Sequence, residues 1–188
     1  MKNGMKILIG IVAVVVLLVA MLGSTYNGLV SKKEEVNGKK SDITVQLKRR
    51  ADLIPNLIST VKGYMKHEQS VIDSVTSARE KMVNANNVSD KIQANDELTT
   101  ALNNLYVVVE NYPDLKASSN FTQLQDELAG TENRIAVARR DYNSAVKDYN
   151  STIKKFPTNL IANLFGFNEE DYFEAEDSVN EAPNVSFE

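Results

Sequence analysis

The 188-residue chain is long enough for one domain plus a segment or two outside it, and its 43% hydrophobic and 24% charged residues are ordinary values for a globular protein. It contains no cysteine, which excludes disulfides, thiolate zinc sites and a cysteine nucleophile, and its net charge of −4 argues against general nucleic-acid binding. Only eight glycines and four prolines are present, which favours long helices over a loop-rich β fold.

The first element is an apolar run from Ile7 to Leu22 that follows Lys2 and Lys6. As a helix, its sixteen residues reach about 24 Å, slightly less than a hydrocarbon core of ~30 Å, and the residues up to Tyr26 extend the span to ~20 residues. A cleaved secretory signal is the alternative, because it also has a basic start and an apolar core. No A-x-A site follows the core, so we expect an uncleaved membrane anchor. Its anchoring positions are Ile7, Ile11, Val15, Leu18, Leu22 and Tyr26.

Charge is distributed unevenly beyond this run. Residues 31–50 carry seven basic and three acidic side chains, a net charge of +4, whereas the chain from Glu169 onward carries eight acidic side chains and no basic one. A basic patch beside the membrane can contact lipid phosphates, and the acidic tail is expected to lie away from it. The amino terminus, Lys2 and Lys6 favour an internal N-terminus, although the lysines after the run compete with them. We expect the rest of the chain on the outer side of the membrane.

A helical period begins at Ile43. Apolar residues then recur at steps of three, four or seven, at Ile43, Leu47, Ile54, Leu57, Val61, Met65, Ile72, Val75 and Met82. Pro55 lies inside this stripe and removes a backbone donor, so a helix here should kink. The alternative is a break, with Asp52 capping a new helix. The apolar phase crosses Pro55 without a slip, which favours one kinked helix, and Gly63 is not expected to end the pattern.

Two further helices are predicted. The sequence NANNV at 84–88 is typical of a turn, Ser89 can cap a helix that runs to about Asn111, and Pro113 closes it. Residues 118–120 offer a cap for the longest period of the chain, which alternates between steps of three and four. Its members are Phe121, Leu124, Leu128, Thr131, Ile135, Ala138, Tyr142, Ala145, Tyr149, Thr152 and Phe156. Alternating small and large layers of this kind indicate a near-antiparallel, left-handed helix bundle.

Pro157 is expected to stop the long helix, after which Thr158 can cap a short helical turn. The apolar residues of that turn should close one end of the bundle, and Gly166 is a natural C-terminal cap. These residues are Leu160, Ile161, Leu164 and Phe165. The acidic remainder is expected to be flexible, although Tyr172, Phe173, Val185 and Phe187 could dock on the bundle.

The sequence offers little chemistry. His67 is the one histidine, so a helical metal motif with two histidines is excluded, and a solvent-facing or hydrogen-bonded role is the better interpretation. Tyr142 and Tyr149 lie on the long apolar stripe, where core packing outweighs a catalytic role. No cofactor-binding, metal or small-molecule substrate motif is recognised, and no catalytic residue is predicted.

Polar residues inside the apolar stripes are the main candidates for a specific role. Arg50, Glu68 and Arg79 would face the bundle, where an unpaired charge is costly. One interpretation is a partly buried ion-pair network that fixes helix register, and the other is a polar groove that binds a partner. The candidate set is Arg49, Arg50, Asp52, Glu68, Arg79, Glu132, Arg139, Arg140 and Asp141, with Arg134 as a further possible counterpart.

Several segments together resemble the LemA family. They are YNGLV at 26–30, VQLKRRADLIPNLISTVKGYMKHE at 45–68, VTSAR at 75–79, the stretch from VVVENYPDLK to VKDYN at 107–150, FP at 156–157, and LFGF at 164–167. The resemblance covers nearly the whole chain beyond the anchor. It implies a single N-terminal membrane segment, an elongated antiparallel bundle of long helices and a bacterial origin. It brings no settled activity.

We therefore expect an all-α protein with an N-terminal transmembrane helix followed by an elongated antiparallel bundle. The expected division is an anchor at 1–25, a LemA-like bundle at 26–167 and an acidic C-terminal tail at 168–188. The expected function is a non-enzymatic scaffold of the bacterial envelope, anchored by a single pass and in contact with membrane lipids. It would associate with itself or with other membrane proteins. The alternative is an accessory or sensor in envelope stress that works with a membrane protease.

Overall fold

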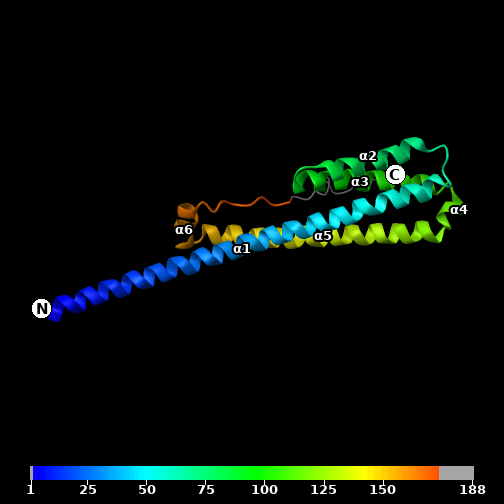
Figure 1. The fold of residues 1–188 in the computed structure, drawn as a ribbon. Helices are drawn as coiled ribbons and strands as arrows, with labels where there is room; N and C mark the ends of the chain where they lie inside the picture. The colour runs from blue at the N-terminus through cyan, green and yellow to red at the C-terminus, as the bar shows by residue number, and fades with distance from the viewer. Residues whose placement is uncertain (1, 174–188) are drawn as a thin grey trace, which may run out of the picture.

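The computed structural model describes residues 2–173, and its described part contains helices and no strand (Figure 1). This confirms the all-α prediction. The helices are α1 (Lys2–Lys62), α2 (Gln69–Asn84), α3 (Val88–Val109), α4 (Pro113–Lys116), α5 (Ser119–Lys154) and α6 (Thr158–Phe165).

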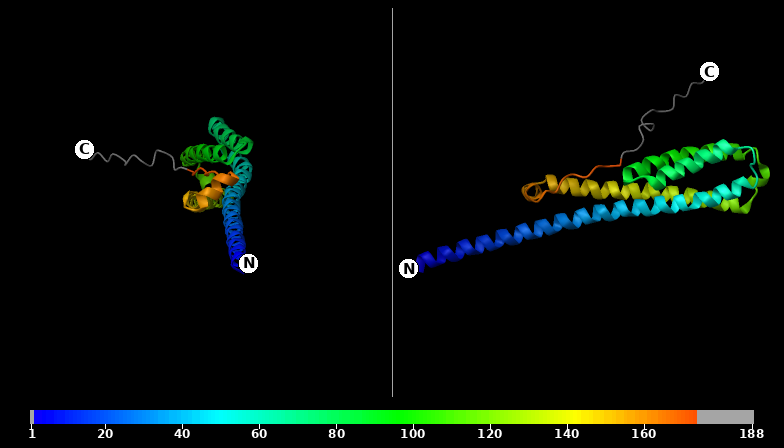
Figure 2. Two further views of the ribbon diagram at one scale, coloured as in Figure 1. Left: turned by 90° about the vertical axis from the view of Figure 1, so that its left-hand side faces the viewer. Right: turned by 45° about the horizontal axis from the view of Figure 1, so that its top comes forward.

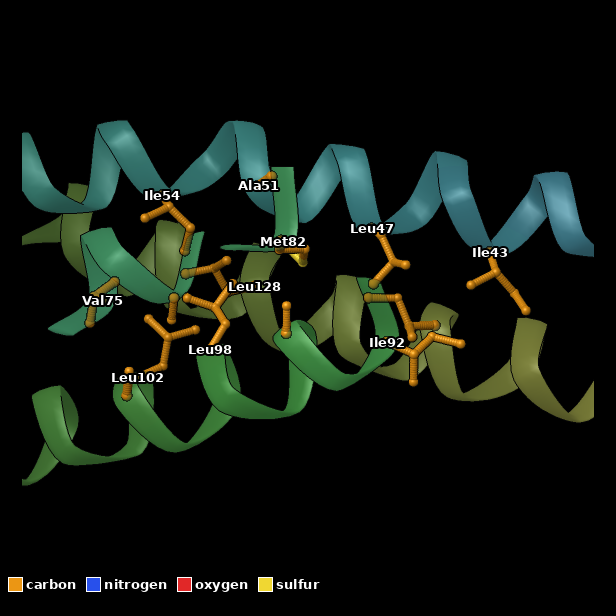
Figure 3. Packing of buried hydrophobic residues seen from close by; sticks show 14 of the residues in the cluster. Ile43, Leu47, Ala51, Ile54, Val75, Met82, Ile92, Leu98, Leu102 and Leu128 are labelled. Atoms are coloured by element: carbon orange, nitrogen blue, oxygen red, sulfur yellow. The ribbon is translucent and has the colours of Figure 1, made fainter. Parts of the chain in front are cut away.

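The long helices α1 and α5 run antiparallel and side by side along most of the bundle, and the hairpin of α2 and α3 packs against the half that is farther from the N-terminus (Figures 1 and 2). The core is therefore widest where α1, α2, α3 and α5 meet. Figure 3 shows side chains from all four helices interlocking there. They include Leu47 and Ile54 of α1, Met82 of α2, Leu98 of α3 and Leu128 of α5.

Helix α1 has two parts with opposite relations to solvent. Its first part carries the apolar run, whose side chains are exposed and are not covered by any other helix among residues 2–173. From Leu29 onward it presents a buried row at intervals of seven residues. That row is Leu29, Val36, Ile43, Arg50 and Leu57. The interval is seven because one face of the helix remains turned toward α5 over this whole length.

Helix α1 passes through Pro55 without interruption, so the continuous helix is confirmed and a break with Asp52 as a new cap is wrong. Pro55 is exposed, and its ring therefore points away from the core. Gly63 does not end the apolar pattern, as predicted, but the helix itself does not continue, because α1 ends at Lys62 and the chain reverses before α2. Met65 is buried inside this turn, which keeps the apolar period running although the helix has ended.

The predicted boundaries of the middle helices need small corrections. Asn87, and not Ser89, caps α3, since its side chain accepts a hydrogen bond from the backbone N–H of Asp90. Pro113 does not only close a helix, because it is the first residue of the short α4. The long α5 ends at Lys154, and Phe156, which was expected to continue its apolar stripe, is 80% exposed.

The C-terminal part differs more from the prediction. Gly166 does cap α6, with φ 74°, the left-handed conformation that favours glycine. The apolar residues of α6 do not all close the bundle, because Leu160, Leu164 and Phe165 are 60%, 74% and 55% exposed and only Ile161 packs inward from the predicted set. Residues 168–173 lie along α5, and the predicted docking of Val185 and Phe187 lies outside the described residues.

Candidate functional site

The only arginine of the buried α1 row, Arg50, is 3% exposed and joins three helices. Its Nη1 donates to Asn95 Oδ1 at 2.6 Å and to Thr99 Oγ1 at 3.0 Å, both on α3. The same nitrogen forms an ion pair with the Glu132 carboxylate on α5. Because one cation contacts both neighbouring helices, sliding either helix along α1 would break a buried polar contact.

Electrostatics in this cluster are a balance of burial and pairing. Desolvation lowers the pKa of Arg50, and the charge of Glu132 opposes that shift. Burial raises the pKa of the Tyr106 phenol on α3, while Arg50 lowers it. Arg50 remains a guanidinium cation at physiological pH, since arginine holds its proton more strongly than any other side chain. The cluster therefore places a permanent positive charge in the core.

Two other arginines of the predicted set also contact the core. Arg139 of α5 lies 3.6 Å from the Asp96 carboxylate of α3, next to the Arg50 cluster. Arg79 of α2 donates its Nε–H to the carbonyl oxygen of Ala51 at 3.0 Å. Arg79 was expected to face the bundle within an ion-pair network or a polar groove, and the structure pairs it with the backbone of α1.

The remaining predicted residues are not part of one network. Glu68 was also expected to face the bundle, and its carboxylate accepts a hydrogen bond from the Tyr112 hydroxyl at 3.1 Å. Arg49 and Asp52 are exposed on α1. Arg140 and Asp141 pair with each other at 3.2 Å on the outside of α5. The sequence set thus divides into a buried cluster around Arg50 and separate contacts at the surface.

Sequence reasoning missed Asn95 and Thr99. A signal was available for Asn95, because it lies three residues after Ile92 and three before Leu98, on the apolar face of α3. A fully buried asparagine needs a hydrogen-bonding partner, and the arginine of the facing helix is that partner.

A second polar arrangement, which sequence reasoning also missed, holds the extended segment Asn168–Phe173 against α5. Asn150 donates its side-chain N–H to the carbonyl of Glu170 at 2.8 Å and accepts the N–H of Glu170 at 2.9 Å. Asn143 does the same with the carbonyl and N–H of Phe173, at 2.8 and 2.9 Å. Both contacts are to the backbone, so the binding of this segment by the two asparagines does not depend on the type of its side chains.

The spacing of the two asparagines explains why the segment fits. They are one heptad apart, which is about 10.5 Å along a helix. Three residues of extended chain, from Glu170 to Phe173, cover about 10 Å. The preceding tyrosine of each pair adds a contact, since Tyr149 donates its O–H to the carbonyl of Asn168 at 2.9 Å and Tyr142 donates to that of Asp171 at 3.0 Å.

We call Asn143, Asn150 and the segment Asn168–Phe173 that they hold the asparagine clamp. Further side-chain contacts reinforce it. Lys33 of α1 forms an ion pair with Glu170. The rings of Tyr142 and Phe173 are 4.5 Å apart between centroids, so Phe173 docks as one sequence alternative allowed. Burial raises the pKa of both tyrosine phenols, and Asp171 adds to the shift of Tyr142. The clamp thus ties the end of the described chain to both α1 and α5.

A groove of about 540 Å³ lies between α1 and α5 on the surface. The residues around it include the small Gly130 and Ala138 and the exposed valines Val45 and Val137. Its lining is Lys39, Asp42, Val45, Gln46, Gly130, Asn133, Arg134, Val137, Ala138 and Asp141. Among residues 2–173, no group of three or more histidine or carboxylate side chains is placed to hold a metal ion.

Comparison with known proteins identifies the family of this bundle. The model of the LemA family matches residues 39–187. The chain belongs to the LemA family. The match begins at residue 39, inside the second part of α1, and covers the helices that pack on it together with the segment Asn168–Phe173.

Relatives with curated names match most of this chain at low identity. Magnetosome proteins MamQ 1 and MamQ 2 of Paramagnetospirillum magneticum are each 26% identical over an alignment 186 residues long, which covers 85% of this chain and 68% of theirs. Magnetosome protein MamQ of Magnetospirillum gryphiswaldense is 23% identical, covering 79% of this chain and 64% of that protein. Protein LemA of Metamycoplasma hominis is 26% identical over 137 residues, covering 72% and 63%.

Proposed function

We propose that this LemA-family protein is a non-enzymatic, single-pass membrane scaffold of the bacterial envelope, in which α1 is both the anchor and the central support of the bundle. The observation that carries the proposal is the continuity of α1, which is one helix from its exposed apolar part to its last buried residue. A helix transmits position and orientation from the membrane to the bundle, whereas a flexible linker does not.

The exposed apolar part of α1 supports the anchoring step. Five of the six positions predicted as anchors, Ile7 to Leu22, lie on the part of α1 that no other described helix covers, and Tyr26, the sixth, packs against Phe165 of α6. A contiguous apolar surface of this size is unstable in water, and a bilayer supplies the missing apolar environment. Membrane lipids are therefore the first proposed partner.

The proposed orientation places the bundle on the outer side of the membrane, which Lys2 and Lys6 before the apolar run support. The chain has no cysteine, so a single Val107→Cys variant gives a unique reporter on the exposed face of α3. We expect a membrane-impermeant maleimide to label this cysteine in intact cells or spheroplasts. Labelling only after lysis would contradict the proposed orientation.

Self-association is proposed to use the groove between α1 and α5, with a second copy of the chain as the occupant. The exposed Val45 and Val137 supply apolar contact area, and the small residues of the groove allow close approach of another helix. The rim carries two cations, Lys39 and Arg134, and two anions, Asp42 and Asp141. A rim with both charge signs is suited to a two-fold arrangement in which the same surface contacts itself.

Light scattering coupled to size-exclusion chromatography tests whether the protein associates with itself through this groove. We expect the full chain in detergent to be a dimer or larger, and Val137→Glu to shift it toward the monomer because it places a charge in the groove. Val107→Glu is the matched control, since it adds the same charge at an exposed valine of α3. A monomeric parent chain, or equal effects of the two variants, would contradict self-association through this groove.

A further inference from the structure

Helix α6 exposes an apolar surface at one particular place in the molecule. Its inner residues, Ile161 and Ala162, are buried against the bundle, while Leu160, Leu164 and Phe165 face outward. The helix lies at the end of the bundle where the apolar part of α1 emerges, and it contacts both α1 and α5 (Figure 1). The exposed residues thus lie beside the proposed membrane anchor and far from the α2–α3 hairpin.

Aromatic contacts fix the level of α6 along α1. The ring of Tyr26 lies 4.9 Å from that of Phe165 and 5.7 Å from that of Phe167, between centroids. Tyr26 follows Leu22, the last residue of the apolar run, by four residues, or about 6 Å of helix. Since the run itself reaches about 24 Å and a hydrocarbon core is ~30 Å thick, a span that begins at Ile7 would place the aromatic contacts at the depth where the hydrocarbon ends.

We propose that the outer face of α6 inserts into the interfacial layer of the same bilayer that α1 crosses. The face consists of Leu160, Leu164 and Phe165, with the neighbouring Phe156. This inference rests on the proposed anchoring by α1 and adds a second membrane contact to it. Aromatic and leucine side chains on a short amphipathic helix are the residues that favour this layer.

Two further observations support lipid as the occupant of this face. The apolar run of α1 is shorter than the hydrocarbon core, and apolar side chains at the level of Tyr26 make up the missing thickness. Lys155 is exposed just before α6 and is close in sequence to the apolar face, so its ammonium group can reach lipid phosphates. With both α1 and α6 in contact with the bilayer, the bundle would have a fixed depth and a fixed rotation relative to the membrane.

A single tryptophan reports the location of α6, because the chain contains none. The full-length Leu164→Trp variant is reconstituted into phosphatidylcholine–phosphatidylglycerol vesicles. These vesicles contain lipids that are brominated either close to the glycerol backbone or near the chain end. We expect a blue-shifted emission and a loss of fluorescence that is larger with the shallow bromines. Leu18→Trp, in the apolar run, and Val107→Trp, at an exposed position of α3, are the matched controls.

The controls separate the two proposals. Quenching of Leu18→Trp and Leu164→Trp, with none for Val107→Trp, supports the interfacial α6. Quenching of Leu18→Trp alone overturns the α6 inference and leaves the anchor in place. A blue-shifted but unquenched Leu164→Trp means that protein covers this face, which also overturns it. If Leu18→Trp itself is not quenched, the proposed anchoring fails, and the α6 inference fails with it.

Discussion

Arg79 donates a hydrogen bond to the one carbonyl that Pro55 leaves without its helical donor. In an α-helix the N–H of residue 55 would bond to the carbonyl of Ala51, and a proline has no N–H. Arg79 Nε, from α2, lies 3.0 Å from that carbonyl oxygen. The continuity of α1 through a proline thus depends partly on a side chain from another helix.

A double-mutant cycle tests this pairing. We expect Arg79→Met to lower the free energy of unfolding by about 1–2 kcal/mol, because a buried carbonyl loses a charged donor. In the Pro55→Ala background the backbone N–H of residue 55 satisfies the carbonyl, so the same change should cost clearly less. Urea unfolding in detergent measures both values. Equal costs in the two backgrounds would show that Arg79 does not replace the missing donor.

The Arg50 cluster is predicted to fix the register of α1, α3 and α5. Replacing Arg50 with methionine leaves the fully buried Asn95 and the partly buried Glu132 without their cation, and we expect a loss of about 2–4 kcal/mol. Arg50→Glu should lower the free energy of unfolding further than Arg50→Met does. Combining Arg50→Glu with Glu132→Arg should restore part of that free energy. Chemical unfolding of the four proteins provides the measurement. A neutral Arg50→Met variant would contradict the structural role.

The asparagine clamp predicts a local effect. Asn150→Ala removes two hydrogen bonds to Glu170, each worth about 1 kcal/mol, so together they should change the opening equilibrium roughly thirtyfold. We therefore expect faster hydrogen exchange at residues 168–173, with little change in the α2–α3 hairpin. Asn104→Ala, at an exposed asparagine of α3, is the control. Unchanged exchange in the Asn150→Ala variant would rule out the clamp.

The same clamp should weaken in alkali. Burial raises the pKa of the Tyr142 and Tyr149 phenols, so the folded protein holds these protons more tightly than the unfolded chain does. Their contribution to stability is complete below the ordinary phenol pKa of about 10 and is lost as pH rises through the raised values.

Phenol ionisation, followed by ultraviolet difference absorbance together with unfolding at each pH, tests this effect. The Tyr142→Phe/Tyr149→Phe variant should lose less stability above pH ~10 than the parent chain does. An identical alkaline decline in the two proteins would show that other groups cause it.

Much of the architecture could be predicted from apolar spacing. The apolar run that ends at Leu22 indicates a membrane span. The seven-residue spacing on α1 and α5 indicates two long helices that remain in contact along their length. The reversal after Lys62 was hidden because Met65 fills the turn and continues the apolar period. Apolar periodicity indicates only which residues are buried. A turn with a buried residue therefore gives the same sequence pattern as a helix that continues.

The contacts at the candidate sites were less accessible. Arg50 lies on an apolar stripe and Glu132 is next to one, so both entered the candidate set, but Arg79 contacts a backbone carbonyl, which has no sequence signature. The exposed face of α6 was mistaken for core because an amphipathic helix shows the same spacing whether protein or lipid covers it. The asparagine clamp depends on the match between a helical heptad and three extended residues, which only the tertiary structure reveals.

The distance between spin labels at Val19→Cys and Ser41→Cys tests most directly whether α1 is one helix from membrane to bundle. Both positions are exposed, the chain has no other cysteine, and dilution with unlabelled protein removes distances between copies. In lipid nanodiscs, twenty-two residues of uninterrupted helix predict a narrow distribution near 33 Å. A broad distribution, or a clearly shorter mean distance, would contradict a rigid link and with it the proposed role of α1 as anchor and central support.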